Sequence, residues 1–418
     1  MATNDQALDA ILSGHNVEIL GGAGRGKSTL INRLSNFFSG CMLKVGPTGS
    51  SALNVGGQTL HRTFGLALEP FIEGVTLKRN LKKERAAILK SPEIQMLVID
   101  EVGACRVDRV TELDWTLRKY RDKDKPFGGL QVIMTGDYLQ LAPVVTDSDR
   151  KVMRPHYNSP YAFDSQAYKD GNFKTVVLTQ NFRQSDSEQQ KILDYLRLGE
   201  NKQLVVEYLN DVCYNTNKAL NNPVVLAPTN KTVDEHNQYH LTNISGKSKI
   251  FKAVVKGDFK EEPSPKIVEL KVGCRVLTTI NDEEERYVNG SSGTVLCINR
   301  NSVTVELDNG MTIDFEPKTS YNYELFVDMS GKVREKIVGS YTQTPLRLGA
   351  AISIHRSQGM TLDQVDLQLG HYPLFGSSML YVAVSRCRDL NSLNINRRLT
   401  VKDIVVDQYV VDHVKKYM

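Results

Sequence analysis

A glycine-rich segment near the amino terminus constrains the fold more than any other part of the chain. Gly21–Ser28 reads GGAGRGKS and fits the pattern GxxxxGK[ST] in full. It lies between an apolar run at Asn16–Leu20, which predicts a strand, and Ser28–Phe38, which predicts a helix. Glycines at such a junction let backbone N–H groups surround phosphate oxygens, and the helix start adds positive potential. The segment therefore predicts a nucleoside triphosphate site in an α/β domain.

The side chains of this segment predict how a nucleotide and its metal ion would be held. Lys27 is expected to reach the β- and γ-phosphates, and the Ser28 hydroxyl is expected to ligate Mg²⁺. An accidental glycine-rich turn is the alternative, and the flanking strand and helix argue against it. We therefore predict ATP and Mg²⁺ as cofactors. The predicted nucleotide-binding residues here are Gly22, Ala23, Gly24, Arg25, Gly26, Lys27, Ser28 and Thr29.

Two adjacent carboxylates follow a later apolar run. Asp100 ends the run MLVID, and Glu101 comes next. Asp100 is expected to be a second Mg²⁺ ligand, and Glu101 is expected to polarise the attacking water. Taken alone, such a pair is commonly a solvated turn, but the Lys27 segment favours a hydrolytic site. A kinase would need no water-activating glutamate, so hydrolysis is favoured over phosphoryl transfer.

The order of apolar runs predicts two α/β regions and one all-β region. Strand-like runs at Met42–Val45, Met96–Asp100 and Gln131–Thr135 alternate with amphipathic segments, which is typical of a parallel sheet. The same alternation restarts at Val176. Between residues 243 and 343 it gives way to short strands separated by Asn/Gly turns, the pattern of a small antiparallel barrel. The barrel is therefore expected to interrupt the second α/β domain.

Composition excludes several classes of protein. A chain of 418 residues is expected to hold two or three domains, and its net charge of +4 excludes a histone-like polycation. The six cysteines include no CxxC pair, which favours reduced thiols over a disulfide framework. We see no signal peptide and no apolar run of about 18 residues that would span a membrane. The chain is expected to be intracellular and soluble, and cytoplasmic if its source is bacterial or viral.

A set of further segments, taken in order, resembles the motifs of one helicase family. The set resembles the Pif-type and RecD-like DNA helicases, which form the B class of superfamily one. The resemblance runs from Gln6 to Arg388. Its segments are GPTGSSALN from Gly46, QTLH from Gln58, PFGGL from Pro126, GDYLQL from Gly136, NFRQ from Asn181, IHRSQGMT from Ile354 and YVAVSRCR from Tyr381.

The resemblance implies two RecA-like P-loop domains with parallel sheets. The first domain is expected at 1–170, with a short pin or wedge insertion at 66–92. The second is expected at 171–242 and 344–418. A small Src-homology-three-like barrel at 243–343 is expected to be inserted in it.

The resemblance also implies roles around the nucleotide. Gln6 resembles the glutamine that contacts adenine, and Gln140 resembles the sensor of the γ-phosphate. Arg183 and Arg386 resemble the two arginines that the second domain supplies to the phosphoryl group. Gly359 joins the predicted nucleotide-binding set. Together with Lys27, Asp100 and Glu101, these residues form the predicted catalytic set.

The resemblance places ten residues in contact with single-stranded DNA. Their hydroxyl, amide and imidazole groups suit phosphate and sugar oxygens and read no sequence. A helix cap or a turn is the alternative for each one. A basic run at Lys78–Arg85 is either the pin or a solvated helix face, and Phe64 and Phe71 are more typical of core. The ten residues are Pro47, Thr48, Thr59, His61, Pro228, Thr229, Asn230, His355, Ser357 and Gln358.

Together these observations predict a monomeric ATP-dependent DNA helicase. The resemblance implies movement five-prime to three-prime on single-stranded DNA, and the protein is expected to act at single-strand/duplex junctions in replication, repair or recombination. Replication proteins such as a single-strand-binding protein are expected partners. An RNA helicase, and a DNA-stimulated translocase or loader that unwinds poorly, remain alternatives. The chain departs from the family at Gly103-Ala104, where Ser-Met is usual, and at Arg356, where Lys is usual.

Overall fold

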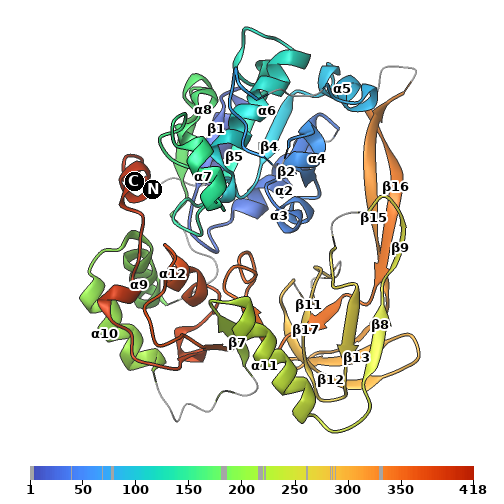
Figure 1. The fold of residues 1–418 in the computed structure, drawn as a ribbon, viewed down its shortest axis with the longest axis vertical. Coiled ribbons are helices and arrows are strands. Elements are labelled where there is room, and N and C mark those ends of the chain that lie inside the picture. Colours follow the sequence, from blue (N-terminus) through green and yellow to red (C-terminus); the bar gives the residue numbers. More distant parts are fainter. Residues whose placement is uncertain are drawn as a thin grey trace. The chain divides into compact units, whose positions relative to one another are not determined.

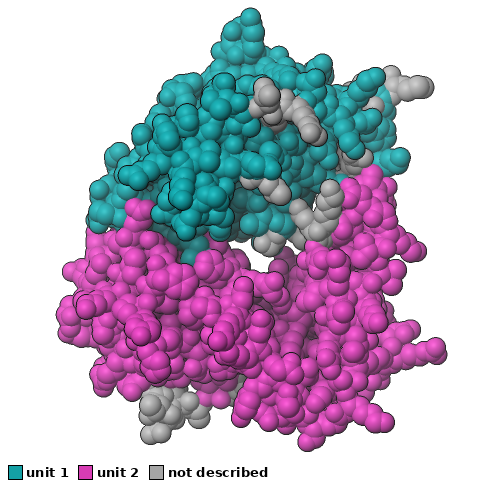
Figure 2. Space-filling view, in the orientation of Figure 1, with its two compact units in different colours: residues 1–182, 323–336, 408–418 teal, residues 183–322, 337–407 magenta. Residues whose placement is uncertain are grey.

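The protein divides into two compact units in the computed structural model (Figure 2). Unit 1 comprises residues 1–182, 323–336 and 408–418, and unit 2 comprises residues 183–322 and 337–407. The structure describes residues 4–38, 40–67, 69–76, 80–179, 186–214, 220, 223–259, 262–282, 284, 286–287, 289–328 and 333–418.

Unit 1 is built on a parallel sheet of six strands (Figure 1). The strand order is β3-β2-β4-β5-β1-β6, and every pair of neighbours is parallel. This sheet confirms the α/β fold and the four strands predicted from the first apolar runs. The strands are β1 (Val17–Leu20), β2 (Met42–Gly46), β3 (Gln58–Thr59), β4 (Met96–Ile99), β5 (Gln131–Gly136) and β6 (Lys174–Val177).

Helices cover the sheet of unit 1. The longest is α6, which lies between β4 and β5 along the chain. The helices are α1 (Asn4–Leu12), α2 (Lys27–Phe37), α3 (Gly49–Asn54), α4 (Leu60–Phe64), α5 (Lys83–Lys90), α6 (Val107–Tyr120), α7 (Asp147–Met153), α8 (Gln166–Asp170) and α13 (Gln408–Lys415). Short 3₁₀ turns are η1 (Val102–Ala104), η2 (Pro126–Gly129) and η3 (Ala162–Asp164).

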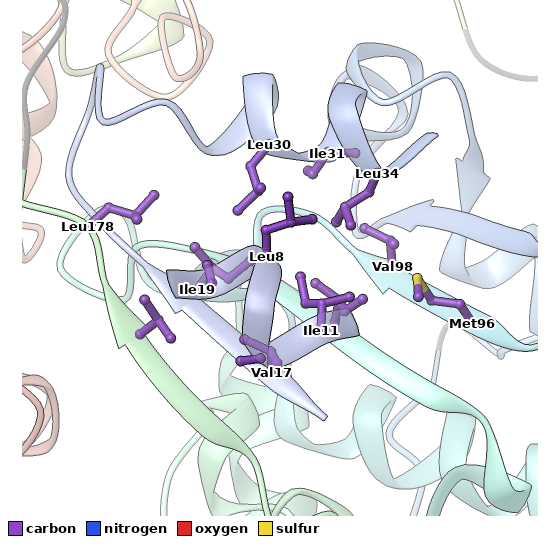
Figure 3. Packing of buried hydrophobic residues seen from close by; sticks show 14 of the residues in the cluster. Leu8, Ile11, Val17, Ile19, Leu30, Ile31, Leu34, Met96, Val98 and Leu178 are labelled. Atoms are coloured by element: carbon purple, nitrogen blue, oxygen red, sulfur yellow. The ribbon is translucent and has the colours of Figure 1, made fainter. Parts of the chain in front are cut away.

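The core of unit 1 forms where α1 and α2 pack on one face of the sheet (Figure 3). Leu8 of α1 and Leu30 of α2 point towards Ile19 of β1. Burying a leucine side chain of this kind contributes about 1.5–3 kcal/mol to folding. The packing therefore fixes the two ends of the glycine-rich segment, because β1 precedes it and α2 follows it. Other members of the cluster include Ile11, Val17, Ile31, Leu34, Met96, Val98 and Leu178.

Unit 2 contains a second parallel sheet, of four strands in the order β18-β7-β19-β20. Its strands are β7 (Val224–Ala227), β18 (Ala351–Ser353), β19 (Val365–Leu367) and β20 (Leu393–Ile395). Its helices are α9 (Ser187–Leu198), α10 (Lys202–Cys213), α11 (Asn230–Asn243) and α12 (Met379–Val384), with 3₁₀ turns η4 (Leu390–Ser392) and η5 (Val401–Asp403).

Between α11 and β18 the paired strands are antiparallel, as the short strands between residues 243 and 343 predicted. A five-stranded sheet has the order β14-β13-β12-β11-β17, and smaller sheets pair β10 with β8 and order β15-β16-β9. Closure into a Src-homology-three-like barrel stays a prediction. The strands are β8 (Lys249–Lys252), β9 (Val254–Gly257), β10 (Ile267–Leu270), β11 (Arg275–Thr278), β12 (Ser292–Ile298), β13 (Val303–Leu307), β14 (Thr312–Phe315), β15 (Lys318–Val327), β16 (Val333–Gln343) and β17 (Leu346–Leu348).

The structure differs from the predicted domain boundaries at three places, one of them residues 323–336, which lie within the predicted barrel and group with unit 1. Strand β6 was expected to open the second domain at 171, but it pairs in parallel with β1, so the first sheet extends beyond residue 170. The last residues, 408–418, were expected in the second domain and instead group with unit 1. The apolar pattern of a strand or helix does not depend on which sheet it packs against. The local sequence pattern therefore could not assign these segments to one domain or the other.

No helix in the part of the chain that the structure describes is long and apolar enough to cross a membrane.

Candidate functional site

The glycine-rich segment forms the turn between β1 and α2. Gly26 lies directly before α2 with φ of 80° and ψ of 13°. This is the left-handed region, which glycine enters without steric cost. The segment is also tied to β5, because the backbone N–H of Gly21 donates to the carbonyl of Gly136 at 3.1 Å. The helix start and the ends of two strands therefore meet at one edge of the sheet.

Lys27 is held inside this turn. Its Nζ donates to the carbonyl oxygens of Gly21 at 2.6 Å and of Gly22 at 3.1 Å. Ser28 and Thr29, which follow in the first turn of α2, are exposed. The ammonium thus donates to backbone carbonyl oxygens in this structure. Phosphate oxygens can accept the same hydrogen bonds in place of those carbonyls.

Asp100 follows β4 and is only 6% exposed. Burial raises the pKa of this carboxyl, and three contacts oppose the rise: the Thr135 hydroxyl, the backbone N–H of Glu101 and the positive charge of Lys27. The Thr135 hydroxyl comes from β5 and donates to Asp100 Oδ1. Asp100 and Lys27, predicted from separate motifs, are therefore electrostatic neighbours.

Glu101 has a strained backbone. Its φ of 53° and ψ of 45° place a non-glycine residue in the left-handed region, at the start of η1. Such strain costs of order 1–3 kcal/mol and concentrates at functional sites. The turn places Glu101, which is partly exposed, directly beside the buried Asp100.

Gln140 lies in the turn after β5. Its side-chain nitrogen donates to Asp137 Oδ2 at 3.4 Å, and Asp137 Oδ1 accepts the backbone N–H of Leu139 at 3.2 Å. The same turn packs closely on the Asp100 turn, because a Cβ added to Gly103 would overlap the carbonyl oxygen of Asp137. Gly103, a departure from the family pattern, therefore permits this close approach.

The other predicted nucleotide contacts fall on separate elements. Gln6 lies on the exposed face of α1. Arg183 lies outside the described residues. Gly359, in unit 2, is exposed with φ of 82°. The roles of these three residues around the nucleotide stay predictions.

Arg386 is buried in unit 2, at 1% exposure, just after α12. Its Nε donates to the carbonyl of Val382 at 2.9 Å, and one terminal nitrogen donates to the carbonyls of Ser357 at 3.4 Å and Met360 at 3.3 Å. The other donates to the Ser385 hydroxyl at 2.9 Å. The guanidinium is thus engaged by its own unit, and contact with a phosphoryl group would require it to exchange some of these partners.

Three of the threonines predicted to contact DNA are helix caps. Thr48 Oγ1 accepts the backbone N–H of Ser51 at 3.2 Å, at the start of α3. Thr59 caps α4 and Thr229 caps α11, through the backbone N–H groups of Arg62 and Thr232 respectively. The capping alternative is confirmed at all three positions. Their contact with a nucleic acid stays a prediction.

The remaining predicted DNA contacts differ in exposure. Ser357 is fully buried and its hydroxyl donates to the carbonyl of Ile354 at 2.8 Å, so a DNA contact by this hydroxyl would require the turn to open. His61 is half-buried, and burial and the positive charge of Arg109 lower its pKa. His355 and Asn230 are exposed, and Pro47, Pro228 and Gln358 are partly exposed.

The insertion predicted as a pin is anchored by buried charges at the start of α6. Asp108 Oδ2 accepts the backbone N–H of Phe71 at 3.1 Å, and Glu112 Oε1 accepts that of Ala67 at 3.3 Å. Arg109 donates to the carbonyl of Glu69 at 3.2 Å. Phe71 is itself buried, as is Phe64, so both aromatic rings are core residues. The basic run begins at Lys78 and Arg79, which lie outside the described residues.

One buried acid of unit 1 was not predicted from the sequence. Glu18 lies within β1, and it accepts hydrogen bonds from Tyr138 and Tyr168. The signal was a single carboxylate inside an otherwise apolar run, NVEIL. Such a residue in a buried strand requires polar partners from elsewhere in the fold.

Comparison with known proteins identifies the family. The family model described as PIF1-like helicase matches residues 3–206. The ATP-dependent DNA helicase Pif1 of Campylobacter jejuni is 30% identical over 415 residues, which span 93% of this chain and 90% of the relative.

Solved structures agree with this assignment. The Pif1 helicase of a Bacteroides species in complex with ADP-AlF4 superposes with a TM-score of 0.91 and 30% identity, covering 99% of this chain and 96% of that one. Bacteroides Pif1 bound to single-stranded DNA gives a TM-score of 0.71 at 30% identity, over 99% and 96% of the two chains. With a sequence relative and these structures matched over nine-tenths or more of their lengths, this chain belongs to the PIF1-like helicase family.

Proposed function

We propose that this helicase couples hydrolysis of Mg-ATP to five-prime to three-prime movement on single-stranded DNA and to separation of duplex strands. The observation that carries the ATPase part is convergence at one sheet edge. The Lys27 turn, the Asp100 turn and the Gln140 turn follow β1, β4 and β5, which are adjacent in the order β4-β5-β1. Ligands of open parallel sheets bind at this carboxyl edge.

The donor set fits a magnesium ion. Mg²⁺ prefers oxygen ligands and usually keeps several waters, with one or two protein ligands beside substrate phosphates. The exposed Ser28 hydroxyl and the buried Asp100 carboxylate supply such oxygens, and a cation would offset the cost of burying Asp100. When bound, the ion would neutralise charge on the phosphates. Lys27 would hold the β- and γ-phosphates, and Glu101 would orient the attacking water.

The second unit is proposed to complete the reaction. Arg183 and Arg386 would add positive charge to the transferring phosphoryl group, as the resemblance implies. Alternating grip of the strand by the two units would then advance the enzyme. Support for a DNA substrate comes from Bacteroides Pif1, which has been solved with single-stranded DNA. The protein is proposed to act as a monomer at single-strand/duplex junctions, in replication, repair or recombination.

The test is unwinding of labelled duplexes that carry a single-stranded tail at one end only. With Mg-ATP, we expect strand separation from a five-prime tail and none from a three-prime tail. The Lys27→Ala variant should bind the same DNA and show neither ATPase nor unwinding, because it lacks the phosphate-binding ammonium. DNA-stimulated ATPase without unwinding of either duplex would instead indicate a translocase or loader. Greater stimulation by RNA would indicate an RNA helicase.

A further inference from the structure

A buried carboxylate lies beside the ATPase site, on the strand that leads into the glycine-rich segment. Glu18 of β1 is 0% exposed. Its Oε1 accepts the hydroxyl of Tyr138 at 2.8 Å, and its Oε2 accepts that of Tyr168 at 2.7 Å. Thr175, which lies opposite Glu18 on β6, donates to Oε2 at 3.3 Å. Both carboxylate oxygens are therefore paired.

Burying a carboxylate in this strand costs desolvation free energy that an apolar side chain would not. Desolvation raises the pKa of Glu18, and the hydroxyls of Tyr168, Tyr138 and Thr175 oppose that rise. An apolar side chain of similar volume would avoid the desolvation altogether. A fully paired buried group does, however, hold its partners in one geometry, because any displacement leaves polar atoms unsatisfied. The carboxylate therefore determines where the two tyrosine rings lie.

Aromatic rings also pack against Tyr138. Its ring meets Phe163 edge-on at 5.0 Å between centroids, and His413 edge-on at 5.9 Å. His413 belongs to α13, and its ring stacks on Phe163 at 3.7 Å. The same helix is fixed by Tyr409, whose hydroxyl lies 2.8 Å from Asp164 Oδ2. Tyr138 therefore contacts both Glu18 and the carboxyl-terminal helix.

Tyr138 stands in the turn that carries the predicted γ-phosphate sensor. Asp137 precedes it, and Gln140 follows two residues later. The backbone N–H of Gln140 donates to the carbonyl of Asp137 at 3.2 Å, and the two side chains are also bonded. These bonds link Gln140 to the residue directly before Tyr138, so a shift of the Tyr138 ring is expected to displace the Gln140 side chain.

We infer that Glu18, Tyr138 and His413 are positioning residues for ATP hydrolysis, which hold the Gln140 turn against the phosphate site. The inference rests on the proposed role of Gln140. It also gives the carboxyl-terminal helix a part in the ATPase, since α13 follows the end of unit 2 at residue 407 and packs on this turn. Glu18 and His413 contact Tyr138, and all three are proposed to act through the turn that carries Tyr138 and Gln140.

The test measures kcat and KM for ATP in DNA-stimulated hydrolysis by Tyr138→Phe, Glu18→Gln and the double variant. Tyr138→Phe keeps the ring and removes only its hydroxyl. A displacement of the sensor turn should lower kcat by about tenfold while KM changes by less than about twofold, because small misplacements act on the reacting geometry. The double variant should be no slower than the slower single variant, since both changes break one contact.

The matched control is Tyr341→Phe. Tyr341 is equally buried, in unit 2, and its hydroxyl donates to the carbonyl of Ser264 at 2.8 Å. It should lose a comparable amount of thermal stability and keep the wild-type kcat. A kcat for Tyr138→Phe equal to that of Tyr341→Phe would overturn the inference. His413→Ala, measured in the same way, removes one of the rings that pack against Tyr138, so the test does not depend on one variant folding.

Gln140→Ala separates this inference from the proposed function. If Gln140→Ala hydrolyses ATP at the wild-type rate, the sensor role is wrong and the positioning role falls with it. If Gln140→Ala is slow and all of the Tyr138, Glu18 and His413 variants are fast, only the positioning inference is wrong.

Discussion

The guanidinium of Arg386 donates a hydrogen bond of 3.4 Å to the backbone carbonyl of Ser357. Through a second bond, to the carbonyl of Met360 at 3.3 Å, it spans the turn that carries Gln358 and Gly359. An arginine proposed to act on ATP is therefore also the internal support of a turn proposed to contact DNA. The two functions are linked by covalent structure and hydrogen bonds within a single unit.

This relationship predicts that Arg386→Ala lowers both ATP hydrolysis and single-stranded DNA binding. Loss of the guanidinium should lower kcat by at least about a thousandfold, the scale seen for arginines that stabilise phosphoryl transfer. It also removes the arginine donors to the carbonyls of Ser357 and Met360, of which the Ser357 carbonyl keeps the backbone N–H of Met360. The lost hydrogen bonds cost about 1–3 kcal/mol and loosen the turn. Single-strand affinity, measured by fluorescence anisotropy without nucleotide, should therefore fall several-fold. Affinity equal to wild type would show that the turn does not depend on Arg386.

The close packing of the Asp100 and Gln140 turns predicts that Gly103→Ala is damaging. The added Cβ would overlap the carbonyl of Asp137, which is backbone and cannot rotate away. We expect a loss of about 1–3 kcal/mol in the free energy of unfolding and a lower kcat, because relief of the overlap displaces Gln140. Gly370→Ala is the control, since nothing lies within 4 Å of its added Cβ. Equal urea midpoints for the two variants would contradict the packing.

The ATPase half of the site was predictable because it depends on short motifs at strand ends. The Lys27, Asp100 and Gln140 turns each follow an apolar run, and parallel strands bring their carboxyl ends together. The role of Glu18 depends on tyrosines 120 and 150 residues away, so no local pattern could show it. The burial of Arg386 likewise depends on long-range contacts with the Ser357 turn.

Residue type alone also could not decide whether the three threonines cap helices or contact DNA. Thr48, Thr59 and Thr229 have hydroxyls that suit either a helix cap or a phosphate, and only the backbone geometry shows that each one caps a helix. The same holds for strand β6, whose apolar residues fit either sheet.

The buried charges that anchor the insertion predict that a mutation there lowers unwinding more than ATP hydrolysis. Asp108 accepts two bonds from Arg106, at 2.6 and 2.8 Å, and one from the backbone of Phe71. Asp108→Asn removes the charge and should loosen the base of the insertion. If the insertion splits the duplex, unwinding should fall several-fold more than single-strand-stimulated ATPase, with both measured on the same preparation.

Asp403→Asn is the matched control for this change. Asp403 is also buried and pairs with Arg397, at 2.7 Å, but it belongs to unit 2, whereas the insertion belongs to unit 1. Its ratio of unwinding to ATPase should equal that of wild type. An unchanged ratio in Asp108→Asn would show that the anchor is structural only.

The carboxyl-terminal helix predicts sensitivity to acid. Burial, followed by the charge of Lys416, lowers the pKa of His413 to about 4, and Asp164 opposes the shift. In the unfolded chain this histidine has a pKa of about 6.5. Between pH 6.5 and 4 the unfolded chain therefore binds a proton that the folded chain does not. Stability is therefore full above pH 6.5, falls between pH 6.5 and 4, and changes no further from this residue below pH 4. The loss should be about 1–2 kcal/mol, after allowance for partial exposure.

His413→Phe tests this origin directly. Phenylalanine keeps a ring against Phe163 and cannot bind a proton, so the variant should retain stability at neutral pH. Its free energy of unfolding in urea should fall less than that of wild type between pH 6.5 and 4, by the contribution of the one histidine. Parallel curves for the two proteins would assign the acid sensitivity to other groups. ATPase assays across the same range would then show whether the docking of α13 limits turnover, since release of His413 removes one support of the Tyr138 ring.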